Sequence, residues 1–358
     1  MADTNSCIKI NFNTFKTLIF AGYLILTACG SRTSTAEITV TDVTKREKIC
    51  INDGRFFYKY PSDSLADKLI YDVRPEVTDR RDDRVADSRP TEAVRAESIQ
   101  DILKPWILPS GNRVIKDTAR WDVRPEGDPG NDFPFGLNSF DDSSWEAIDL
   151  PHDWAIKGPF LEGPDVVVGG GMGRLPVNGV AWYRKKLDIP ATDKGRSVFL
   201  EVDGAMSYAI VWLNGHLVGG WPYGYNSFRL DLTPYISPGG DNQLAIRIDN
   251  PANSARWYPG AGIYRNVWLV KTDPVHVAQW GTFITTPDVS IESATINLEI
   301  TIDNDSENDA VVEVNTEVYS LGPESKRVGE PAIVFPPLYT TINARGSSTV
   351  NGLSLIHI

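Results

Sequence analysis

The sequence predicts an all-β protein made of two successive antiparallel β-sandwiches. Several short segments place an apolar residue at every second position, which is the period of a strand with one face in a core. Turn-forming glycine, proline, asparagine and aspartate separate these segments, and no convincing amphipathic helix interrupts them. Hydrophobic residues make up 41% of the 358 residues, so packed cores are affordable in a chain of this length.

The first sandwich is predicted over residues 45–272. Its clearest strands are 198–203, 209–213 and 244–249, each with alternate residues directed to one core face. Asn214-Gly215 follows the second of these strands and is the strongest short signal for a hairpin turn. Residues 62–132 lack periodic pattern and are interpreted as a solvated insertion, whose role the sequence leaves open.

The second sandwich begins after residue 273. Alternation over 296–302 predicts one strand, and Val312, Val314 and Val318 are expected to share the face of the next one. About three strands fit before residue 352, against about seven in a complete immunoglobulin-like domain, so 274–352 is interpreted as incomplete. Residues 353–358 back-translate to a common sequencing adaptor and are expected to be an artefact at a truncated end of the reading frame.

The N-terminus is predicted to be an export signal. Residues 17–26 are apolar but too short to span a bilayer comfortably, and lysines precede them, so 1–28 is interpreted as a signal peptide. Leu26-Thr-Ala-Cys29 resembles a bacterial lipobox, which makes Cys29 the expected lipidation site and 29–44 a tether. The mature protein is then expected in the cell envelope, lipid-anchored in the periplasm or at the outer membrane. The alternative is a plain signal peptide with a chance cysteine.

Charge and metal-ligand residues narrow the classes of partner. The formal net charge of −12 argues against nucleic acid, because no basic excess is present to neutralise phosphates. Cys50 would be the only free thiol of the mature body, which rules out a disulfide framework, and the four histidines lack metal-ligand spacing. No cofactor or metal site is therefore expected in this chain, although a metal ion in a longer protein stays open.

Six motifs occur in an order that resembles one enzyme family. Together they are similar to the N-terminal, galactose-binding-like jelly-roll sandwich of glycoside hydrolase family 2, the β-galactosidase type, and 274–352 is similar to the start of its immunoglobulin-like domain. The early Ile51–Phe56 segment fits the family's opening strand. The motifs are Leu150-Pro-His-Asp-Trp154, Trp182-Tyr-Arg-Lys185, Val211-Trp-Leu-Asn-Gly-His216, Tyr223-Gly-Tyr-Asn-Ser-Phe228, Asp231-Leu-Thr-Pro-Tyr235 and Gly262-Ile-Tyr-Arg265.

This resemblance implies hydrolysis of terminal β-linked sugars with retention of configuration. The two catalytic glutamates of the family lie on a TIM barrel that would follow the second sandwich, so no catalytic residue is assigned here and this chain alone is expected to be inactive. The implied partners are a carbohydrate substrate, the missing barrel and a membrane reached through the lipid anchor; a homo-oligomer is left open. The alternatives are a β-glucuronidase or β-mannosidase of the same family, or a non-enzymatic glycan-binding surface lipoprotein.

Two residues are predicted to contact substrate. Asn178 lies at the place of a family asparagine that contacts the sugar, and its amide both donates to and accepts from hydroxyls. Arg256 stands near the place of a family acidic residue, so only a donor role fits it. The structural alternatives are a tight turn at Asn178-Gly179 and an ion pair of Arg256 with Asp249. His152 and Asp153 are interpreted as turn and packing residues.

Overall fold

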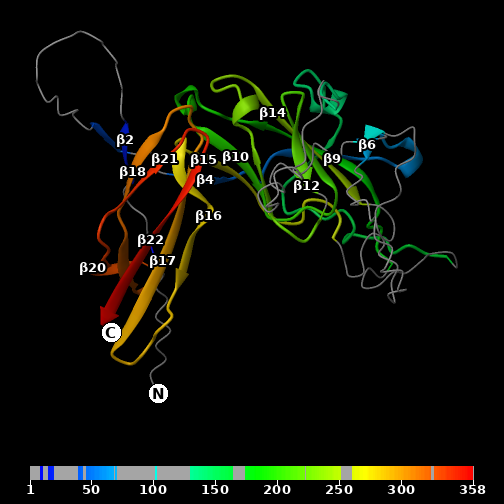
Figure 1. Cartoon of the computed structure of the whole chain (residues 1–358). Coiled ribbons are helices and arrows are strands. Elements are labelled where there is room, and N and C mark those ends of the chain that lie inside the picture. The colour runs from blue at the N-terminus through cyan, green and yellow to red at the C-terminus, as the bar shows by residue number, and fades with distance from the viewer. Residues whose placement is uncertain are drawn as a thin grey trace, which may run out of the picture. The chain divides into compact units, whose positions relative to one another are not determined.

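The computed structural model describes residues 9–10, 15–19, 39–42, 46–67, 69–70, 101–102, 130–163, 174–221, 223–250, 260–323 and 326–357. The chain divides into two compact units (Figure 1). One unit is Glu47–Lys271, and the other joins Met1–Arg46 to Thr272–Ile358.

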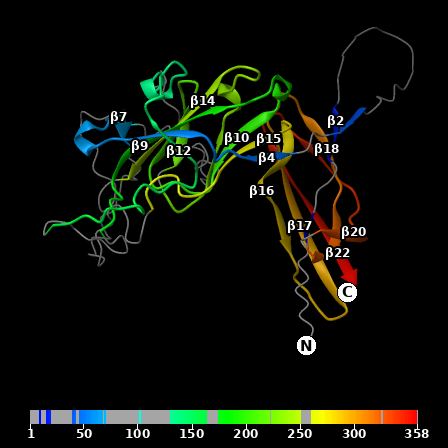
Figure 2. The same cartoon turned by 180° about the vertical axis from the view of Figure 1, so that it is seen from behind.

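The unit Glu47–Lys271 is an antiparallel β-sandwich, which confirms the predicted fold class. Its smaller sheet has the order β13-β10-β15-β4, and its larger sheet has the order β12-β11-β14-β9-β5-β8. Figures 1 and 2 show β10, β15 and β4 side by side. The strands are β4 (Glu47–Cys50), β5 (Arg55–Lys59), β8 (Glu146–Ile148), β9 (Gly179–Leu187), β10 (Ser197–Val202), β11 (Ala209–Leu213), β12 (His216–Trp221), β13 (Phe228–Asp231), β14 (Asn242–Asn250) and β15 (Val267–Thr272).

Short pieces connect these strands. Three-residue 3-10 helices are present at η1 (Asp63–Leu65), η6 (Pro134–Gly136), η8 (Ala191–Asp193) and η9 (Thr233–Tyr235). In the insertion, β6 (Leu69–Ile70) pairs in parallel with β7 (Asp101–Ile102).

The main core lies between the two sheets and contains the residues that the alternation selected. Val198, Leu200 and Val202 of β10 are fully buried there. The predicted hairpin is also present, because β11 and β12 flank Asn214 and Gly215, whose φ angles are 53° and 82°. Two positive φ angles in a two-residue loop match the strand twist, and asparagine and glycine tolerate them best.

The prediction of one core face per strand was wrong for the larger sheet. β11 is buried at every position, because Ile210 and Trp212 enter a second core on the other side of the sheet. The segment 130–145 covers that side with aromatic rings; Phe133, for example, stacks on Trp182 with ring centroids 5.0 Å apart. The six-stranded sheet is therefore the middle layer of three.

A buried guanidinium fastens the covering segment to the sheet. Arg184 on β9 is 1% exposed and donates from Nε to Asp142 Oδ2 at 2.8 Å. It also donates to the backbone oxygens of Phe135, Leu137 (3.1 Å) and Phe140 (3.4 Å). The oxygen of Leu137 also accepts from the N–H of Phe140, but those of Phe135 and Phe140 depend on Arg184, and burying a carbonyl without a donor is unfavourable.

The first residues of the insertion are bound to the same face. Asp67 accepts from Trp182 Nε1 at 2.9 Å and from Arg247 Nε at 2.8 Å. Arg247 is 1% exposed and also pairs with Asp249 at 3.1 Å. Asp67 thus packs on the sandwich, as does the buried Leu69, whereas residues 61–65 are exposed. Most of 62–132 lies outside the described residues, so the interpretation as a solvated insertion stays a prediction.

The second unit is built from β-strands as well. The described part of 275–357 holds seven strands, against the three or so that were expected, so the strand count does not support the interpretation of 274–352 as incomplete. They are β16 (Val275–Thr285), β17 (Ser293–Asn304), β18 (Ala310–Val314), β19 (Glu317–Leu321), β20 (Arg327–Val334), β21 (Leu338–Ile342) and β22 (Ser347–His357). One missed strand is β20, which is largely exposed and lacks a clear apolar period, and another is β21, which carries two consecutive threonines.

The alternation predicted over 296–302 is present in β17, whose residues are buried at every second position. β17 lies between β16 and β22 in one sheet. Val312, Val314 and Val318 all enter the core, although Val318 belongs to β19, a separate strand. Residues 353–357 pair with β17 as the last part of β22. Their origin as an adaptor artefact stays a prediction.

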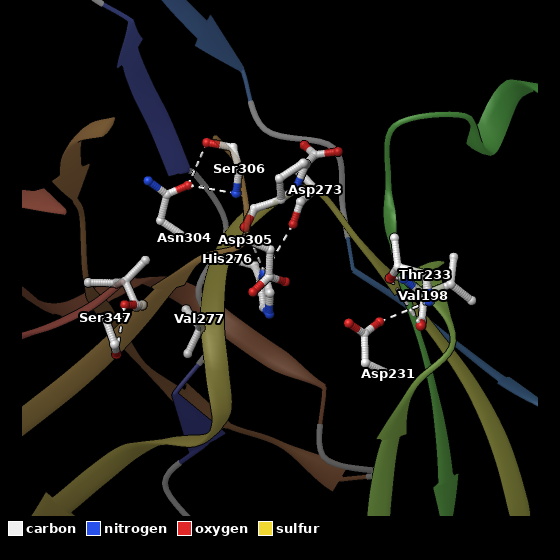
Figure 3. Close-up of polar contacts among 12 residues, drawn as sticks. Val198, Asp231, Thr233, Asp273, His276, Val277, Asn304, Asp305, Ser306 and Ser347 are labelled. Carbon is white, nitrogen blue, oxygen red and sulfur yellow. Dashed lines mark hydrogen bonds and ion pairs between the residues drawn. The ribbon is translucent and has the colours of Figure 1, made fainter. Parts of the chain in front are cut away.

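Polar side chains close one end of β17. Asn304 Nδ2 donates to the backbone oxygens of Asn308 (2.8 Å) and Ile342 (3.2 Å), and its Oδ1 accepts from Ser306 (Figure 3). His276 Nδ1 lies 3.0 Å from the oxygen of Asp273 and 3.8 Å from Asp305 Oδ2. These contacts order the turn after β17.

Three short N-terminal strands pair within the second unit. β1 (Lys9–Ile10) pairs with β19, β2 (Phe15–Ile19) pairs with β18, and β3 (Thr39–Asp42) pairs with β2. β2 overlaps the segment interpreted as a signal peptide. The structure is that of the uncleaved chain, so the pairing of β2 does not test whether residues 1–28 are removed. Cleavage of the signal peptide stays a prediction. Among the described residues, no helix reaches the length and apolar character that crossing a membrane requires.

We expect Arg184→Met to lower the free energy of unfolding by about 3 kcal/mol, because it leaves Asp142 and three carbonyls without their donor. Urea unfolding followed by tryptophan fluorescence measures this. Lys186→Met is the matched control, since Lys186 is exposed on the same strand, and we expect a change below about 0.5 kcal/mol. Equal effects of the two substitutions would contradict the assigned role of Arg184.

Candidate functional site

The candidate site lies where residues 174–180 enter β9. Two side chains hold this segment in place. Trp154 Nε1 donates to the oxygen of Pro176 at 3.2 Å. Asn250 Nδ2, at the end of β14, donates to the oxygen of Val177 at 2.8 Å and to that of Gly260 at 3.3 Å. Val177 itself is buried, so the backbone on either side of Asn178 has little freedom.

Asn178 is half-buried and has an unsatisfied acceptor. Its Oδ1 is shielded from solvent and accepts no hydrogen bond from the part of the chain that the structure describes. A buried amide oxygen without a donor costs about 1–3 kcal/mol, so a rearrangement that supplies a donor is favourable. Gly179 follows with φ 130°, which only glycine adopts readily, so Asn178-Gly179 is indeed a sharp backbone feature. The structure thus shows the turn and leaves the contact with substrate a prediction.

Lys59 and Trp154 lie beside this segment. Lys59 ends β5, next to Ala181 of β9, and its Nζ lies 5.7 Å from the centroid of the Trp154 ring. A Cβ atom on Gly179 would lie 2.7 Å from Lys59 Nζ, so the amine packs closely against this glycine. Burial lowers the pKa of Lys59, and the nearby Asp63 carboxylate opposes this shift. An indole face, an amine and an amide are groups that commonly contact sugars.

His152 and Asp153 have packing and turn roles in the structure. The backbone N–H groups of His152 and Trp154 donate to the oxygens of Ile263 and Ala261, each at 2.9 Å. His152 Nδ1 lies 3.0 Å from the hydroxyl of Tyr183, and burial lowers the pKa of His152. Asp153 Oδ1 accepts from the N–H of Ala155 at 2.9 Å.

The structure does not describe the two other residues for which the sequence predicted a role. Arg256 and Cys29 both lie outside the described residues, so their roles stay predictions. Asp249, the partner suggested for Arg256, is paired with Arg247. Tyr264, near the end of the aromatic loop 256–265, donates its hydroxyl to the oxygen of Gly224 at 2.8 Å and therefore packs on the sandwich.

Sequence reasoning missed Lys59, because a single lysine at the end of a strand gives no signal. It also missed the covering role of 130–145, although the aromatic residues of that segment are a usable signal. Such rings need a buried partner or a ligand.

Comparisons with known proteins agree with this architecture. Residues 176–261 match the family model described as the glycosyl hydrolase 2 galactose-binding domain-like region. The chain is 47% identical over 177 residues to the β-galactosidase BoGH2A of Bacteroides ovatus, covering 49% of this chain and 20% of that protein. It is 36% identical over 169 residues to a putative β-glucuronidase of Formosa agariphila, covering 47% and 16%.

A solved structure is similar as well. The glycosyl hydrolase family 2 member from Bacteroides cellulosilyticus is 29% identical with a TM-score of 0.52, covering 66% of this chain and 30% of that chain. The chain spans a fifth of the length of the first curated relative and about a sixth of the second.

We expect the stability of the protein to fall as the pH drops below the ordinary pKa of histidine, about 6.5. The unfolded imidazole of His152 then takes a proton that the folded one resists, because burial lowers its folded pKa. In His152→Asn, the free energy of unfolding should depend less steeply on pH between 6.5 and 5. His216→Asn, at an exposed position of β12, is the control for loss of an imidazole. If His216→Asn, and not His152→Asn, makes the free energy of unfolding less dependent on pH, the role assigned to His152 is wrong.

Proposed function

Because this chain carries the galactose-binding domain-like region of glycoside hydrolase family 2, we propose that it is the N-terminal, non-catalytic part of a β-galactosidase-like enzyme. The enzyme would hydrolyse terminal β-linked sugars with retention. Its catalytic carboxylates would lie on a TIM barrel outside this chain. The observation that carries the proposal is the 47% identity over 177 residues with the β-galactosidase BoGH2A of Bacteroides ovatus.

The sandwich would contribute to substrate positioning. Asn178 has an acceptor without a donor, and a sugar hydroxyl is such a donor. Since Oδ1 is shielded in this conformation, the amide has to turn outward to reach a sugar. Satisfying a buried acceptor makes that change favourable. Arg256 is proposed as a second contact, acting as a donor.

Two other functions remain as candidates. One is a β-glucuronidase of the same family, since several relatives carry that name. The sandwich does not decide between the two sugars, because most contacts with the sugar are expected to come from the barrel. A free-standing glycan-binding lipoprotein is the non-enzymatic candidate. For all three, we propose export through the signal peptide and anchoring to the cell envelope through Cys29.

We expect this chain, purified alone, to release no nitrophenol from nitrophenyl β-galactoside or β-glucuronide, because it lacks the two carboxylates. The product of a longer reading frame from the same gene should hydrolyse the galactoside. Turnover by the pure chain would refute the assignment of no catalytic residue. A longer product that cleaves only the glucuronide would overturn the choice of sugar.

In the longer protein, we expect Asn178→Ala to lower kcat/KM about tenfold or more, because one hydrogen bond to substrate is worth roughly 1.5 kcal/mol. Asn178→Asp keeps an acceptor of the same shape and loses the amide donor, which separates the two roles. Asn138→Ala, at an exposed position of the covering segment, is the matched control. An unchanged kcat/KM in Asn178→Ala would assign Asn178 to the turn alone.

A further inference from the structure

We propose that Tyr223 and Tyr225 form a stacking site for a sugar unit of an oligosaccharide, beyond the terminal unit that reaches Asn178. This inference rests on the proposed function, since it assumes that a glycan approaches this end of the sandwich. It adds to that function a preference for oligosaccharides over single glycosides.

The first observation is that the tyrosine pair is open to solvent. Tyr223 is 55% exposed, and its ring centroid lies 5.4 Å from that of the half-buried Tyr225, with 63° between the ring planes. Within 203–208, 223–228 and 262–266, all of which the structure describes, Tyr223 is the one large apolar side chain that is exposed. A phenol ring in water gains free energy when a flat apolar face covers it.

The second observation is that the loop carrying the pair is held in place. The hydroxyl of Tyr264 donates to the oxygen of Gly224, between the two tyrosines, at 2.8 Å. A Cβ atom on Gly224 would lie 2.0 Å from Met206 Sδ, so the backbone of the loop rests on this methionine. Met206 in turn exchanges two backbone hydrogen bonds with Gly262, at 2.9 and 3.2 Å. The rings are therefore presented on a fixed base, which lowers the entropy lost on binding.

The third observation is that polar groups lie near the rings. Asn226 and Ser227 are exposed on the same loop. Arg265 is also exposed, and its guanidinium carbon lies 5.7 Å from the centroid of the Tyr264 ring. An aromatic face with hydrogen-bonding groups around it suits a pyranose ring, which has an apolar face and an edge of hydroxyls.

The tyrosine loop and Asn178 emerge at the same end of the larger sheet. β12, which precedes the loop, and β14 are both antiparallel to β11, so Trp221 and Asn250 end their strands on the same side. β9 starts opposite the end of β14. Gly260 connects the two places, because its oxygen accepts from Asn250 and a Cβ atom on it would lie 3.4 Å from the ring of Tyr264. One glycan chain can therefore contact both.

The test measures binding of a β-linked galactotetraose and of methyl β-D-galactoside to the complete 358-residue chain by isothermal titration calorimetry. We expect the tetraose to bind roughly fivefold more tightly or better, because it reaches the tyrosine pair as well as Asn178. In Tyr223→Ala this preference should disappear, and in Tyr223→Phe, which keeps the ring, it should persist. Tyr339→Ala removes a tyrosine of the second unit that is 62% exposed, and it should change neither affinity.

Three outcomes overturn the inference. These are equal binding of the two sugars, a preference that survives in Tyr223→Ala, and an equal loss of the preference in Tyr339→Ala. Circular dichroism checks that the variants fold, and Tyr223→Gln gives the same test without an aromatic ring if Tyr223→Ala does not fold. The nitrophenyl assays use single sugar units and the longer protein, so a failure of the proposed function there is distinguishable from a failure of binding here.

Discussion

The first unit depends on the burial of both faces of its six-stranded sheet. One face packs on the smaller sheet, and the other packs on a segment with little regular structure. Such a segment pairs only some of its own backbone groups, within turns, so the sheet supplies further donors. Arg184 does this for three carbonyls, while Arg247 and Trp182 bind the start of the insertion through Asp67. Two residues of the Trp182–Lys185 motif, Trp182 and Arg184, therefore have a structural role in this protein, because they bind the segments that cover the sheet.

The features that sequence reasoning predicted correctly are those decided by adjacent residues. The hairpin at Asn214-Gly215 follows from the backbone conformations that two residues tolerate. The alternation of β17 follows from a strand with one face in a core and one outside it. In both cases the pattern needs no information from distant parts of the chain.

The features that were missed depend on distant contacts or on weak patterns. Nothing local in β11 shows that its second face is covered by 130–145. The strand β20 is largely exposed, so the hydrophobic period that defines a strand is faint there. For the site, Asn178 was found only through resemblance, and Lys59 became visible only when β5 and β9 were placed side by side. Which side chains become neighbours is a property of the folded arrangement, which the order of residues along the chain does not show.

The pairing of β2 with β18 has a consequence for export. Four residues of β18, Val311–Val314, lie opposite Phe15–Leu18 of the predicted leader. If the leader is removed at Cys29, β18 becomes an open edge whose backbone groups face outward. Open edges recruit other strands, either correctly or through aggregation. Removal of the leader would thus leave an unpaired edge in this sheet, where another strand could pair.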